Sequence, residues 1–242
     1  MSAYRLVFEE HFRRTGAPDS DHWHIEVGDK WANQEKQCYT ADPANVHIRD
    51  NRLFIISTLH EEGPCKYRSA RINTRSRLHW QYGRFVIRAR MPKGRGSWPA
   101  FWFLSEGHAN GIRWPLCGEI DLMEYAGNHP GRIIASLHTA AFNHRTNTER
   151  TTETFVNDAD TAFHDYAMEW TKDQLVFSID GKSYARYERQ HGDGEREWPF
   201  DQPFYLIINM AVGGMFGGTI VDDDFPFVLE VDSIKVYQQT DV

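Results

Sequence analysis

Alternation of apolar and polar residues with a period of two is the feature that most limits what this chain can fold into. Successive side chains of a β-strand point to opposite faces, so such alternation indicates a strand with one wet face. The clearest case is residues 82–92, where Phe85, Ile87, Ala89 and Met91 alternate with Arg84, Arg88 and Arg90. No window of ten or more residues holds the 3.6-residue period of a helix, so we expect no long helix.

Other segments extend the same pattern. Residues 51–59 and 204–212 are apolar on both faces and read as buried strands. Residues 174–187 form a strand, an Asp-Gly pair and a second strand, which predicts a hairpin. The last strand shifts its apolar phase between Val231 and Ile234. Many short strands separated by turns predict an all-β fold, an antiparallel sandwich or barrel.

Composition narrows the function. The 242 residues contain no repeat and no linker, so we expect residues 1–242 to form one domain. The net charge is −7, which disfavours a nucleic-acid partner because phosphate binding needs clustered cations. No apolar run is long enough to span a membrane. The aromatic content is 14%, with eight Trp, which suits stacking on the apolar faces of sugar rings.

The cysteines and the first residues bear on the compartment. Cys38, Cys65 and Cys117 are odd in number and lack metal-ligand spacing, so three reduced thiols are the simpler expectation, with one disulfide and one free thiol as the alternative. The beginning of the chain lacks the basic and apolar segments of a secretory signal. We expect a secreted protein whose signal is absent from this sequence, with a cytoplasmic location as the alternative.

One strand carries three carboxylates. Glu119 and Asp121 share a face in a regular strand, but strict alternation sends Glu124 to the opposite, apolar face. An unpaired carboxylate buried there is costly. A single β-bulge at Leu122 and Met123 turns both apolar side chains inward and returns Glu124 to the face of the other two acids. The sequence therefore predicts a bulge and three acids on one surface.

Two kinds of chemistry use clustered carboxylates. A calcium ion takes six to eight oxygen ligands, usually from a loop that wraps the ion, and one stiff strand cannot wrap it. A retaining glycosidase needs a nucleophile and an acid/base whose carboxyl groups lie about 5–5.5 Å apart. Repulsion among the three acids would also keep at least one of them protonated at a raised pH. The spacing favours the glycosidase over the metal site, and a solvated acidic edge is the structural alternative.

The motif E-[IL]-D-x-x-E, preceded closely by Trp-Pro, resembles the signature of family-16 glycoside hydrolases. The step from Glu119 to Glu124 resembles the bulged form of laminarinases, agarases and carrageenases. Five further segments resemble the laminarinase type in the expected order: WANQEKQCYT (31–40), SARINT (69–74), YGRFVIRARMPKGRGSWPAFWFL (82–104), FHDYAMEW (163–170) and NMAVGG (209–214). The resemblance covers nearly the whole chain and is closest to endo-β-1,3-glucanases.

This resemblance implies a β-jelly-roll, a sandwich of two curved antiparallel sheets with a concave sugar-binding cleft. It implies retaining endo-hydrolysis of β-1,3-glucosidic bonds in laminarin-like or mixed-linkage glucans, with no cofactor for the chemistry. Glu119 would be the nucleophile, Glu124 the general acid/base and Asp121 the assisting carboxylate. The expected partner is a polysaccharide, and the expected state is a monomer.

The resemblance also implies binding residues. The candidates around the sugars are Trp98, Trp102 and Trp114 for stacking on the non-reducing side, Asn33 and Arg71 for hydroxyl groups there, and His138 near the scissile bond. Packed core aromatics, a surface ion pair for the arginine and an ordinary strand histidine are the alternatives. Relatives often carry a structural calcium ion, to which Glu10 and Asp232 would contribute.

Two other functions remain open at the level of sequence. A β-glucan-binding module without activity fits the fold, but such modules have lost the acids that this chain keeps. A galactan hydrolase of the agarase or carrageenase type shares the bulge. Sulfated galactans need a cationic cleft, for which Arg84, Arg88 and Arg90 are candidates unless they face solvent.

Overall fold

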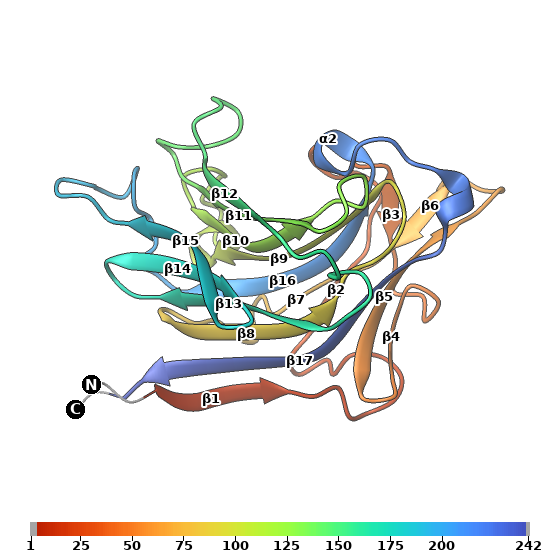
Figure 1. Ribbon diagram of the computed structural model, residues 1–242, viewed down its shortest axis with the longest axis horizontal. Helices are drawn as coiled ribbons and strands as arrows, with labels where there is room; N and C mark the ends of the chain where they lie inside the picture. The colour runs from red at the N-terminus through yellow and green to blue at the C-terminus, as the bar shows by residue number, and fades with distance from the viewer. Residues whose placement is uncertain (1–3, 241–242) are drawn as a thin grey trace.

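The computed structural model describes residues 4–240, which form two stacked β-sheets (Figure 1). The seven-stranded sheet contains, in spatial order, β12 (Arg150–Phe155), β11 (Arg132–His138), β10 (Glu119–Tyr125), β9 (Ser97–Ser105), β16 (Phe204–Val212), β7 (Arg71–Asn73) and β2 (His24–Glu26). The ten-stranded sheet contains β15 (Lys182–Glu188), β14 (Gln174–Ile179), β13 (His164–Trp170), β8 (Gly83–Arg90), β17 (Phe227–Gln239), β5 (Arg52–Leu59), β6 (Tyr67–Ser69) and β3 (Gln37–Tyr39), with β1 (Tyr4–Glu10) on β17 and β4 (Val46–Arg49) on β5.

The all-β, β-jelly-roll sandwich expected from the sequence is confirmed. Within residues 4–240 the strand pairs are antiparallel except β3 with β6, which is parallel. The helical segments are short: α1 (Glu106–Ala109), α2 (Gly214–Gly217) and the 3₁₀ turn η1 (Asp222–Asp224). No helix among the described residues has the length and apolar character needed to cross a bilayer.

The predicted strands form as expected. β8 alternates strictly between buried and more exposed residues, and all nine residues of β16 are buried. The hairpin between β14 and β15 turns at Asp180 and Gly181, whose φ angles of 50° and 76° suit a type I′ turn. The register of β17 shifts between Val231 and Ser233, where its apolar phase changes.

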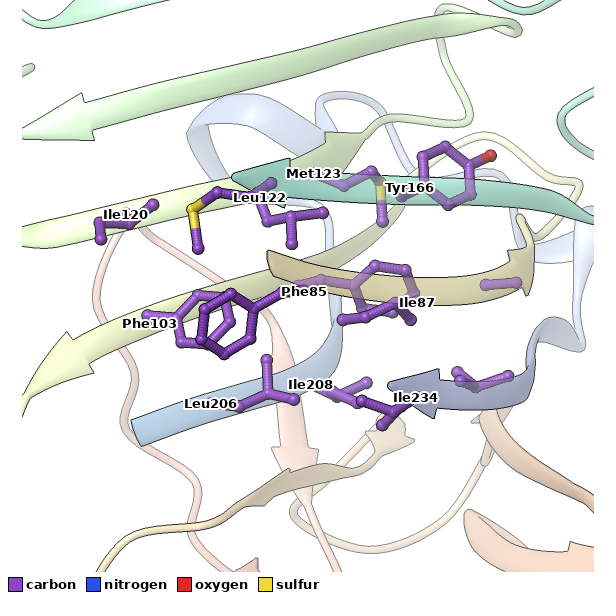
Figure 2. Packing of buried hydrophobic residues seen from close by; sticks show 14 of the residues in the cluster. Phe85, Ile87, Phe103, Ile120, Leu122, Met123, Tyr166, Leu206, Ile208 and Ile234 are labelled. Carbon is purple, nitrogen blue, oxygen red and sulfur yellow. The ribbon is translucent and has the colours of Figure 1, made fainter. Parts of the chain in front are cut away.

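The main core lies between the two sheets (Figure 2). Ile120, Leu122 and Met123 of β10 are at most 1% exposed and belong to the same cluster as Phe85 and Ile87 of β8. Full burial of one such side chain stabilises the fold by roughly 1.5–3 kcal/mol. One face of the seven-stranded sheet is therefore committed to packing, and its other face is available for a binding surface.

The expectation of three reduced thiols is wrong. Cys38 and Cys65 form a disulfide, and Cys117 is free and buried. Cys38 lies in β3 and Cys65 just before β6, and the parallel pairing of these two strands brings the Cα atoms to 5.8 Å, within disulfide range. The sequence separation of 27 residues carries no signal for this pairing.

Removal of the disulfide is expected to lower thermal stability. Closing a 27-residue loop in the unfolded chain contributes about 3.5 kcal/mol in the chain-entropy view. The Cys38→Ser, Cys65→Ser double variant should therefore unfold roughly 10 °C below the parent. Calorimetry with and without reductant checks this. The parent should lose stability in reductant and the double variant should not; a parent insensitive to reductant would contradict the prediction.

Candidate active site

The bulge predicted in the acidic strand is present. The register of β10 shifts between Asp121 and Glu124 against β11, and between Asp121 and Met123 against β9. Leu122 and Met123 are both buried in the core between the sheets. Glu119, Asp121 and Glu124 consequently all lie on the opposite face, where they line a cleft.

The cleft has two lobes that share the three acids. The first lobe is lined by Arg71, Asn209 and Trp102 from β7, β16 and β9, and by Trp114 from the segment before β10. The second lobe is lined by side chains of β11 and β12, including Arg132, Ser136, His138 and Thr151. Asn33 and Trp98 line both lobes, as the acids do. The acids therefore stand between two binding spaces.

The contacts around the acids are specific. His138 places Nε2 3.2 Å from Oδ2 of Asp121 and 3.8 Å from Oε1 of Glu119. The indole Nε1 of Trp98 donates a hydrogen bond to Oε1 of Glu124 at 3.0 Å. The two glutamates thus have different neighbours: Glu119 faces an imidazole, and Glu124 is held by an indole.

The electrostatics of the cluster favour proton retention. Burial raises the pKa of Glu119, Asp121 and Glu124, in each case to about 8. The charge of Asp121 raises the pKa of both glutamates further, while His138 lowers it. Because like charges this close cannot all ionise easily, one carboxyl group can keep its proton while a neighbour is charged. This is the condition that paired acid and nucleophile chemistry needs.

The predicted tryptophans on β9 do share a face. Trp98 and Trp102 both line the cleft, whereas Phe101 and Phe103 between and beside them belong to the core cluster. Trp102 donates through Nε1 to Oδ1 of Asn209 at 2.6 Å, which fixes the ring. These two side chains are therefore part of the cleft and not of the main core.

Arg71 combines both alternatives considered from the sequence. Its Nε lies 2.8 Å from Oε2 of Glu26 in an ion pair, and its guanidinium lies 4.8 Å from the ring centre of Trp102. It also lines the first lobe. Trp114 lines that lobe too, but His144 stacks on its ring at 4.8 Å, so sugar stacking by Trp114 stays a prediction.

Several residues in the cleft escaped the sequence interpretation. Glu35 lines the first lobe, accepts hydrogen bonds from Gln37 Nε2 at 2.7 Å and from the hydroxyl of Tyr39 at 3.4 Å, and has its pKa raised by burial. Asn209 holds Trp102. Both lie inside segments that carry the family resemblance, which was the available signal. His144 lies outside the segments that carry the family resemblance, so it had no comparable signal in the sequence.

The calcium ion at Glu10 and Asp232 stays a prediction. Asp232 lies 3.6 Å from Arg52 and 3.9 Å from Arg88, and these guanidiniums disfavour a cation beside it. Glu10 accepts a hydrogen bond from the Phe12 N–H and faces His22. Among residues 4–240, the group with metal-ligand spacing is Glu119, Asp121 and His138, the cluster described above.

The arginines of β8 do not serve the cleft. They lie on the other sheet, where Arg88 pairs with Asp165 at 3.1 Å and Arg90 pairs with Glu230. The cationic cleft that a sulfated galactan requires is therefore not supplied by this strand.

A β-sandwich whose cleft gathers paired carboxylates and tryptophans is typical of polysaccharide-cleaving glycoside hydrolases. The model of the glycosyl hydrolases family 16 matches residues 29–223. The chain belongs to this family.

Individual relatives of this chain are consistent with that family. A beta-glucanase of Rhodothermus marinus is 43% identical over 97% of this chain and 85% of its own length. The X-ray structure of the laminarinase from Rhodothermus marinus superposes with a TM-score of 0.95, at 39% identity, and covers both chains fully. A non-specific endo-β-1,3(4)-glucanase of family 16, crystallised as a mutant with 1,3-β-D-cellotriosyl-glucose, gives a TM-score of 0.92 at 36% identity, covering 99% and 96% of the two chains.

Proposed function

We propose that the protein is a retaining endo-β-1,3-glucanase that acts on laminarin-like glucans. The observation that carries the proposal is the bulged strand β10, which puts Glu119, Asp121 and Glu124 on one surface between two lobes of a cleft. The similarity to a beta-glucanase, a laminarinase and an endo-β-1,3(4)-glucanase supports the substrate class.

The chemistry is double displacement. The carboxylate of Glu119 attacks the anomeric carbon and forms a glycosyl ester, while protonated Glu124 gives its proton to the departing glycosidic oxygen. Glu124, now a carboxylate, then takes a proton from water, whose oxygen attacks the same carbon and releases Glu119. Two inversions restore the original configuration. No cofactor enters either step.

The surroundings suit these roles. His138 lies beside Glu119 and lowers the pKa of that carboxyl, which favours the charged nucleophile. Asp121 lies between the glutamates and raises the pKa of Glu124, which favours the protonated acid. The Trp98 indole holds Glu124 in place through Oε1. Burial and Asp121 raise the pKa of both glutamates, and His138 lowers both. The two therefore differ in their contacts: Glu119 faces the imidazole, and Glu124 accepts the hydrogen bond of the indole.

Substrate binding follows from the two lobes. Trp98 and Trp102 offer ring surface to sugars in the first lobe, with Arg71 and Asn33 beside them for hydroxyl groups. The second lobe, with His138, takes the sugars on the leaving side. Space on both sides of the acids suits cleavage inside a chain. We expect a monomer that is secreted, since the Cys38–Cys65 disulfide suits an oxidising compartment.

The alternatives are less favoured. A non-hydrolytic glucan-binding module has no use for three acids whose mutual repulsion and burial oppose folding. A hydrolase of sulfated galactan needs unpaired cationic side chains in the cleft. The arginines of β8 are paired elsewhere. Arg71 and Arg132, which line the cleft, are paired with Glu26 and Glu153.

A comparison of polysaccharides tests the function. The parent protein should release reducing ends from laminarin, and from barley β-glucan if mixed linkages are accepted, but not from agarose or carrageenan. Proton NMR of the first products should show the β-anomer before mutarotation. Release from agarose alone would overturn the substrate assignment, and initial α-anomers would overturn retention.

Two variants are expected to shift the pH dependence of kcat/KM in opposite directions. The basic limb of kcat/KM reports the loss of the Glu124 proton, and it should lie well above the ordinary pKa of a glutamate because burial raises the pKa of this carboxyl to about 8. Asp121→Asn removes a negative charge and should move that limb to lower pH. His138→Gln removes the imidazole that lowers the pKa of Glu124 and should move the limb to higher pH. Shifts of the same sign in both variants would contradict these roles.

A further inference from the structure

The loop between β11 and β12, residues 139–149, is built to hold one shape. The side chain of the buried Asn143 organises it: Nδ2 donates to the carbonyl of Thr139 at 3.1 Å, and Oδ1 accepts from the backbone N–H of Arg145 at 3.2 Å. The backbone N–H of Asn143 donates to Oγ1 of Thr148 at 3.2 Å. The loop rises from the seven-stranded sheet (Figure 1) and carries His144 to the cleft.

The loop also packs against Trp114, in the segment that precedes β10. The ring of His144 stacks on Trp114 with centroids 4.8 Å apart and planes inclined by 30°. The guanidinium carbon of Arg145 lies 4.5 Å from the ring centre of Trp114. His144 also approaches His138 edge-on, with centroids 5.0 Å apart, and the ring centroid of Trp114 lies 5.9 Å from that of His138. The imidazole is therefore part of a three-ring cluster with the tryptophan and the histidine that contacts Asp121 and Glu119.

The polar atoms of His144 remain unused. Within residues 4–240, neither ring nitrogen forms a hydrogen bond or ion pair with the protein, although the ring is half-buried and lines both lobes together with the three acids. Burial lowers the pKa of His144, and the nearby His138 lowers it further. A neutral imidazole offers one donor and one acceptor, which matches a sugar hydroxyl.

We propose that His144 is a substrate-binding residue that hydrogen-bonds a hydroxyl of the sugar leaving across the scissile bond, so that it selects for a saccharide leaving group. This inference rests on the proposed function. His144 lines both lobes, and its place in the connection between β11 and β12, whose residues Ser136 and Thr151 line the second lobe, favours the leaving side. The sugars held by Arg71 and Trp102 lie in the first lobe, on the other side of the acids.

Three variants and two substrates test this assignment. His144→Phe keeps a ring to stack on Trp114 but has no ring nitrogen. His144→Asn keeps a donor and an acceptor but loses the stack. His191→Asn, at an exposed histidine between β15 and β16, is the control. The substrates are a laminari-oligosaccharide long enough to fill both lobes and an aryl β-laminaribioside, whose phenol leaving group has no sugar hydroxyl.

The expected result is selective. His144→Phe should lose about tenfold in kcat/KM on the oligosaccharide, the effect of one hydrogen bond, and change by less than twofold on the aryl substrate. His144→Asn should recover most of the oligosaccharide rate, and the control should match the parent on both substrates. Near-UV circular dichroism confirms that each variant is folded.

Other outcomes overturn the inference. Equal losses on both substrates in His144→Phe would place the effect at the acids or at a sugar in the first lobe, and not at the leaving sugar. No loss on either substrate, or recovery by Phe but not by Asn, would assign His144 to packing against Trp114. A parent protein inactive on both substrates would overturn the proposed function and this inference with it, whereas an active parent isolates the role of His144.

Discussion

Replacing Glu119 by Gln is expected to lower kcat on laminarin by about four orders of magnitude or more, because double displacement cannot begin without the attacking carboxylate. The variant removes the charge and keeps the shape of the side chain. It should fold at least as well as the parent above neutral pH, since burial raises the pKa of this carboxyl and its ionisation therefore opposes folding there. Activity and thermal midpoint measured on the same sample separate the two effects.

A matched variant and a rescue experiment sharpen this prediction. Glu188→Gln changes an exposed glutamate of β15 and should retain parental activity. Glu119→Gly should regain turnover of an activated aryl β-glucoside when azide is supplied. Azide would displace the phenol in a single step, so the product should be the α-glucosyl azide. A β-azide, or laminarin cleavage by Glu119→Gln at the parental rate, would remove Glu119 from the role of nucleophile.

Replacing Glu124 by Gln is expected to give a loss that depends on the leaving group. On laminarin, general acid catalysis is absent and kcat/KM should fall by about 10³-fold. On a 2,4-dinitrophenyl β-glycoside, whose phenolate departs without a proton, the first step should fall by less than tenfold. The second step still lacks its base, so the glycosyl-enzyme should accumulate and give a burst of phenolate.

The comparison of laminarin with the dinitrophenyl substrate distinguishes the general acid from a carboxylate that has only a structural role. Asp121→Asn changes the neighbouring carboxyl. It should lower kcat/KM on both substrates by similar factors, because Asp121 does not protonate the departing oxygen. Equal losses for Glu124→Gln on laminarin and on the dinitrophenyl substrate, without a burst, would assign the acid to another residue.

Much of the fold could be predicted from local patterns. The alternation in β8, the apolar run of β16 and the Asp-Gly hairpin each report a preference that depends on a few adjacent residues. The bulge in β10 could also be predicted, because burying Glu124 in the core would cost more free energy than an irregularity in the strand. Local patterns alone therefore predict that the three acids lie on one face.

Contacts between distant segments were the part that could not be predicted. The pairing of Cys38 with Cys65 depends on two short parallel strands. The ion pairs of Asp232 with arginines of β5 and β8 join residues that are far apart in the chain. The alternation around Arg88 predicts that one face of its strand is exposed to solvent. It does not predict that this strand belongs to the ten-stranded sheet, which does not carry the cleft.

By itself, the sequence determined which segments become strands, where one of them bulges and that three carboxyl groups share a surface. These properties follow from the two-residue period of the strand and from the cost of burying charge, both of which act over a few residues. Only the tertiary structure decided what faces those acids. His138 reaches them from the next strand and Trp98 from the strand on the other side, and His144 lines the same cleft from a loop that packs against Trp114. Such neighbours are set by register and loop docking, which join residues far apart in the chain.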